Sequence, residues 1–125
     1  MGVGTWALWN VGVAGLLGAA GVVLAATAAH RVADPSLTTA ALFLILHAAA
    51  VMGLSALAGG SPLPTGFLVS ASLMIVAVAL FSGDVASRVL LDDRLFPMAA
   101  PLGGSLLILA WLAAALTGIA AALRS

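Results

Sequence analysis

The sequence predicts an all-α fold, an integral membrane bundle of four transmembrane helices that form a single domain over residues 1–125. Of the 125 residues, 64% are apolar and 6% are charged, whereas soluble domains carry about 25% charged residues. Four apolar stretches approach the roughly 20 residues that a helix needs to cross about 30 Å of hydrocarbon. The charges balance and lysine is absent, so nucleic acid is not an expected partner.

The first two spans are expected at about residues 5–29 and 35–58. The first is uncharged and ends where His30 restores polarity. A cleaved signal peptide is the alternative, but no positively charged segment precedes the apolar stretch. The second span has a clear start signal, because Asp34 can cap a helix N-terminus and Pro35 suits the first helical position.

The last two spans are expected at about residues 65–91 and 101–123. Near the end of the third span, Asp84, Arg88 and Asp92 follow one another at spacings of four. This spacing places the three charges on one helix face, where each acid can pair with the central arginine. The third helix is therefore expected to protrude into the membrane interface.

An even number of spans places both termini on one side of the membrane. The connections after the first and third spans, together with the end of the third helix, then share the other side and carry Arg31, Arg88 and Arg94, against Arg124 alone at the C-terminus. By the positive-inside rule the charged connections face the cytoplasm and the termini lie outside. The expected location is the plasma (inner) membrane, with the lipid bilayer as the first partner.

Small residues recur along the first span. Within a bilayer, helices associate through close backbone approach and interhelical hydrogen bonds, which small residues permit. The sequence therefore predicts a packing face, with a ligand groove as the less favoured interpretation, from glycines at every third position: Gly12, Gly15, Gly18 and Gly21.

Four ionisable residues form a candidate polar site, His30, His47, Asp84 and Arg88. Such groups avoid lipid, so they are expected to face protein or water. Two histidines suit a proton relay or a metal site. The competing interpretation is that they hydrogen-bond neighbouring helices, and that the Asp84–Arg88 pair neutralises itself as the helix leaves the bilayer.

Three tryptophans and one asparagine have structural interpretations. Trp6 and Trp9 lie near the start of the first span and are expected to anchor it among the lipid headgroups. Trp111 lies in the middle of the fourth span, so its N–H is expected to have an internal partner. Asn10 is expected to donate and accept hydrogen bonds between helices.

The chain shows no enzyme signature. It contains no cysteine and no P-loop, HExxH motif or nucleophile elbow, so no catalytic residue, cofactor or metal is expected. The leading hypothesis is a non-enzymatic subunit or accessory factor, within a homo-oligomer or a larger membrane-protein complex. The alternative is an oligomeric transporter or channel-like module that uses the four polar residues as its path.

Several segments together resemble a known family. In order and spacing they resemble its LGAxGVxLGAFGAH, HALA, LFSGS and TPxGGxxxxxGW elements at Leu17–His30, His47–Ala50, Leu80–Asp84 and Pro97–Trp111, although Ala25-Ala26-Thr27-Ala28 replaces Gly-Ala-Phe-Gly in the first. The chain therefore resembles the YgdD/YwdK-like small bacterial membrane proteins of unknown function, relatives of eukaryotic transmembrane protein 256. It is a divergent member, since Asp84 stands where a serine is usual. The resemblance implies a four-helix inner-membrane protein and no established activity.

Overall fold

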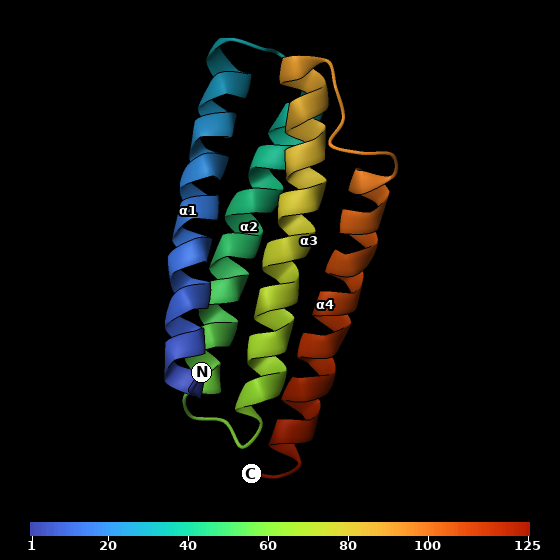
Figure 1. Ribbon diagram of the computed structural model, residues 1–125. Coiled ribbons are helices and arrows are strands. Elements are labelled where there is room, and N and C mark those ends of the chain that lie inside the picture. Colours follow the sequence, from blue (N-terminus) through green and yellow to red (C-terminus); the bar gives the residue numbers. More distant parts are fainter.

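The computed structural model describes residues 1–125 as four helices: α1 Val3–His30, α2 Pro35–Ala58, α3 Pro64–Leu91 and α4 Ala99–Ala122 (Figure 1). The shorter helices, with 24 residues, are roughly 36 Å long, more than the ~30 Å of a bilayer's hydrocarbon core. All four helices are long and apolar enough to cross a membrane. The predicted fold class, an all-α bundle of four membrane-spanning helices, is confirmed.

A local sequence signal explains where α2 begins, but not where α4 begins. The Asp34 carboxylate accepts the Ser36 backbone N–H at 2.8 Å, and Pro35 occupies the first position of α2, as predicted. α4 begins at Ala99, two residues before the expected start at Pro101. A proline is tolerated in the first turn of a helix, because no intrahelical bond there needs its missing N–H.

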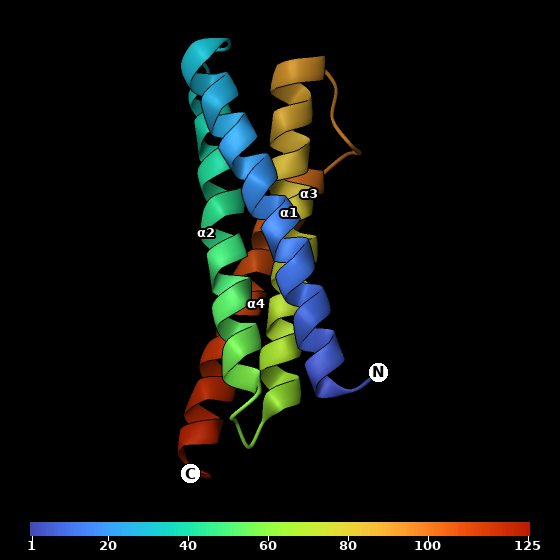
Figure 2. The ribbon, with the colours of Figure 1, turned by 90° about the vertical axis from the view of Figure 1, so that its left-hand side faces the viewer.

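The helices are arranged around a central pair, α2 and α3. α1 packs on α2 and less extensively on α3, whereas α4 packs on α3. Figures 1 and 2 show α1 and α4 on opposite sides of the central pair. Both termini and the α2–α3 turn lie at one end of the bundle, and the other two connections lie toward the opposite end. This is the relative placement that four spans require.

The buried core lies mainly along the central pair, with Val51, Ala71 and Met74 fully buried. Large apolar side chains cover the outside of the bundle. Leu16 is 73% exposed, Leu46 56% and Leu116 68%, and many others share this exposure. An apolar exterior of this extent is stable in lipid and not in water.

Three glycines allow the helices to approach closely. A Cβ added at Gly103 would lie 2.6 Å from the Phe81 backbone nitrogen, so α4 rests directly on the α3 main chain. A Cβ at Gly21 would lie 3.0 Å from the Ala41 carbonyl oxygen of α2, and one at Gly66 would lie 2.6 Å from the Thr117 side chain. Close packing of this kind is the expected use of small residues in a membrane bundle.

The glycines of the predicted packing face of α1 lie in two different surroundings. Gly12 and Gly15 do not pack within the chain, since a Cβ at either would meet no atom within 4 Å, whereas Gly18 and Gly21 face α2. A step of three residues turns a helix by about 300°, so successive glycines are offset by roughly 60°. The four glycines therefore point in different directions around the α1 axis, and only Gly18 and Gly21 contribute to the α1–α2 interface.

Candidate functional site

His47 lies at the middle of α2 and is 3% exposed. Its Nδ1 lies 2.8 Å from the Phe43 carbonyl oxygen, one turn earlier, and its Nε2 lies 3.2 Å from the indole nitrogen of Trp111. A carbonyl only accepts and an indole N–H only donates, so the proton of His47 must be on Nδ1 and its Nε2 must be bare. Both ring nitrogens of the neutral imidazole are thus satisfied within the protein.

Trp111 extends from α4 to contact His47 of α2. Its indole N–H has the predicted internal partner, although the residue itself is 46% exposed. The two rings meet edge to face at 6.0 Å between centroids. Phe43 continues the row, stacked against Phe81 of α3 at 4.7 Å. An aromatic row therefore connects α2 with both α3 and α4.

An open groove of about 450 Å³ lies between α2 and α4 at this level. Apart from His47 and Trp111, whose polar ring atoms bond to each other, its walls are formed by glycine and apolar side chains: Phe43, Leu46, Gly104, Leu107 and Ile108. The groove is therefore hydrophobic and does not resemble an aqueous path.

Asp84 and Arg88 form a second polar group near the end of α3. Asp84 is 3% exposed, and its Oδ1 accepts the backbone N–H of Leu95 at 2.9 Å. Its Oδ2 lies 3.3 Å from Nε of Arg88, whose side chain is 44% exposed. Asp84 thereby fastens the α3–α4 connection to α3. Asp92 does not pair with Arg88 as predicted, because α3 ends at Leu91 and Asp92 turns away in a left-handed conformation with φ 54°.

The four residues of the predicted polar site do not form one centre. His30 is exposed at the end of α1, His47 bonds to Trp111, and Asp84 and Arg88 lie near the end of α3. No three histidine or acidic side chains gather closely enough to hold a metal ion. His47 shares no pocket with Asp84 or Arg88.

A third polar group links α1 to α3. Asn10 is 5% exposed; its Nδ2 donates to the Leu68 carbonyl oxygen at 3.4 Å, and its Oδ1 accepts the Ser72 hydroxyl at 3.0 Å. The predicted interhelical role of Asn10 is confirmed. Trp6, which is predicted to anchor α1 among the headgroups, donates its indole N–H to the Ser72 hydroxyl at 2.9 Å. Trp9 remains 65% exposed on the outer surface.

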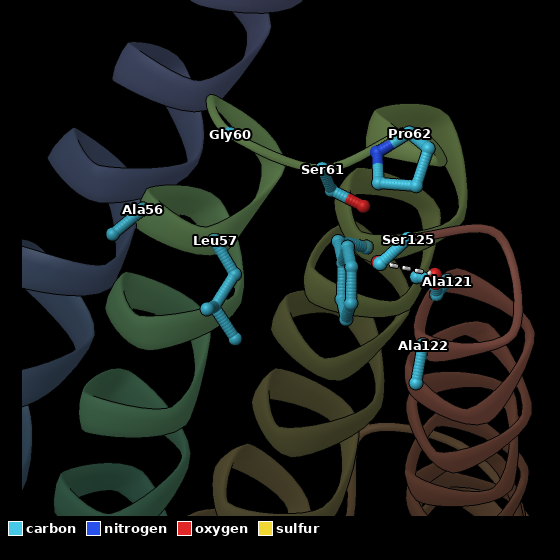
Figure 3. Close-up of a pocket in the computed structure, with 9 residues that line it drawn as sticks. Ala56, Leu57, Gly60, Ser61, Pro62, Ala121, Ala122 and Ser125 are labelled. Atoms are coloured by element: carbon cyan, nitrogen blue, oxygen red, sulfur yellow. Dashed lines mark hydrogen bonds between the residues drawn. The ribbon is translucent and has the colours of Figure 1, made fainter.

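The end of the bundle near the termini holds a further hollow of about 370 Å³, between the α2–α3 turn and the end of α4 (Figure 3). Its hydroxyls are already bonded: the Ser61 oxygen accepts the Leu63 N–H, and the Ser125 hydroxyl donates to the Ala121 carbonyl. No ionisable side chain lines this hollow.

Four apolar helices, an apolar exterior and internally paired polar groups define an α-helical membrane protein. Residues 17–104, well over half of the chain, match the family described as "Protein of unknown function (DUF423)", and the chain belongs to this family. The match begins at Leu17, the first residue of the first family motif, and agrees with the resemblance seen in the sequence. No curated protein and no solved structure matches the chain.

Proposed function

We propose that the protein is a non-enzymatic subunit or accessory factor of the plasma (inner) membrane, without a cofactor, that packs against other membrane proteins. One observation carries this proposal: the polar groups inside the bundle bond to one another. Asn10 bonds to Ser72, His47 bonds to Trp111, and the only buried side-chain polar atom without a partner is the Ser55 hydroxyl. Groups engaged in this way contribute their hydrogen bonds to contacts between helices.

The helix most available to a partner is α1. Only Asn10, Ala14 and Gly21 of its 28 residues are buried. Gly12 and Gly15 are exposed and have open space where a side chain would be. An outward face with small residues allows a helix of another protein to approach the α1 backbone closely. This supports lateral packing, either with other proteins or with copies of the same chain.

The alternative is an oligomeric transporter or channel-like module. It needs His30, His47, Asp84 and Arg88 on a continuous polar path, and these residues lie in three separate places. The groove beside His47 is otherwise lined by glycine and apolar side chains, with Trp111 bonded to His47. The packing role therefore has more support than the transporter. The arginine distribution favours an orientation in which the charged connections face the cytoplasm.

The test of this proposal is the size of the assembly that mild detergent extracts from native membranes. Wild type is expected to migrate as a complex larger than the monomer, and Gly12→Leu and Gly15→Leu are expected to release the monomer by blocking close approach. Gly118→Leu is the matched control, since a Cβ at this α4 glycine also meets no atom within 4 Å. A monomeric wild type, or an α1 variant that retains the complex, would contradict the proposal.

A further inference from the structure

A polar pocket lies between the start of α2 and the last turns of α3. Its volume is about 370 Å³, and it is lined by Asp34, Ser36, Val85, Arg88 and Val89. Of the four pockets in the bundle, it is the one that oppositely charged side chains line together.

The pocket lies at the depth of the lipid headgroups. α3 has 28 residues and is about 42 Å long, so the hydrocarbon core, ~30 Å thick, accommodates only about 20 of them. Arg88 is one turn from the end of this helix, and Asp34 directly precedes α2. Both charges thus lie where the apolar helices leave the bilayer.

The two charges face the pocket without neutralising each other. Arg88 contacts Asp84 through Nε at 3.3 Å, and its side chain remains 44% exposed. Asp34 uses Oδ1 to accept the Ser36 N–H and forms no ion pair with Arg88 or with the nearby Arg31. A positive and a negative group are therefore available on one pocket, beside the apolar surface of Val85 and Val89.

We propose that this pocket binds the headgroup of a phospholipid that carries a primary ammonium group, such as phosphatidylethanolamine. The terminal nitrogens of Arg88 donate to the lipid phosphate, and the free carboxylate oxygen of Asp34 accepts from the ammonium. A choline headgroup has no N–H to donate to Asp34, and a glycerol headgroup has no positive charge. The site therefore selects a zwitterionic lipid with a hydrogen-bond donor.

The test is a competition between lipids for the full-length protein, with bound lipid counted by native mass spectrometry. With equimolar phosphatidylethanolamine and phosphatidylcholine of identical acyl chains, wild type is expected to favour phosphatidylethanolamine by roughly threefold, as for a partly exposed ion pair. Asp34→Asn should bring this ratio close to one. Asparagine caps a helix as well as aspartate does, so α2 should remain folded.

The matched control is Asp93→Asn, which removes the same charge from the exposed α3–α4 connection, outside the pocket. It should retain the wild-type ratio. Three results would overturn the proposal: equal binding of the two lipids by wild type, a preference for phosphatidylglycerol when this lipid replaces phosphatidylcholine in the competition, or a phosphatidylethanolamine preference that survives Asp34→Asn. None of these depends on whether α1 packs against a partner.

Discussion

His47 and Trp111 each bring a polar ring atom to the middle of the membrane, where an unpaired group is costly. Each is the partner of the other at 3.2 Å, and the second nitrogen of His47 is bonded within its own helix. Side-chain hydrogen bonds between membrane helices contribute about 0.6 kcal/mol on average and up to ~1.7 kcal/mol. The hydrogen bond between the two side chains therefore makes a small but specific contribution to the packing of α2 against α4.

Trp111→Phe is expected to lower the free energy of unfolding by about 0.5–1.5 kcal/mol, because it leaves Nε2 of His47 buried without a donor. The same substitution in a His47→Phe background should cost clearly less. A double-mutant cycle measured by reversible unfolding in detergent micelles checks this coupling. Strictly additive effects of the two substitutions would show that the bond contributes nothing.

At the scale of the helices, glycine position determines how closely two backbones approach. Gly103 of α4 rests on the α3 main chain, where an added Cβ would lie 2.6 Å from the Phe81 nitrogen and 2.8 Å from the Ala77 carbonyl oxygen. Backbone atoms cannot move aside as a flexible side chain can. A single methyl group there must push the two helices apart.

Gly103→Ala is expected to destabilise the bundle by about 1–3 kcal/mol, the usual range for overpacking. Gly118→Ala, on the same helix but facing open space, should be neutral or slightly stabilising, since alanine favours the helix. Thermal unfolding of the two variants and wild type in one detergent makes the comparison. If both variants had the same stability, the close approach of α3 and α4 would not matter energetically.

The helices themselves are predictable from the sequence, because their signals are local. Asp34 and Pro35 mark the start of α2, and the apolar stretches have the length of a span. The contacts between helices are not local. Gly103 and Gly66 were not singled out for close packing, and Ser72 was missed, because nothing near them in sequence identifies the helix that they face. The bond between His47 and Trp111 joins positions 64 residues apart. The sequence therefore identified His47 as a polar residue within the membrane but could not show that Trp111 is its partner.

At the scale of the whole molecule, the bundle is open, because α1 and α4 do not pack against each other. The central pair α2 and α3 contributes most of the buried residues, whereas α1 and α4 lie on opposite sides and expose much of their surface. Such a molecule depends on lipid, or on partner helices, to cover its apolar exterior. Its polar side chains within the membrane stabilise the contacts between helices.

The most direct test of the central claim, four spans with the termini on one side, is labelling of single cysteines by a membrane-impermeant maleimide, in sealed cells for the outer side and in inside-out membrane vesicles for the inner side. The chain contains no cysteine, so each label reports one position. Gly60→Cys and Ser125→Cys should react from the same side of the membrane, and Ala33→Cys and Asp93→Cys only from the other. Reaction of Gly60→Cys and Ala33→Cys from one side, or of all four from both sides, would contradict the account.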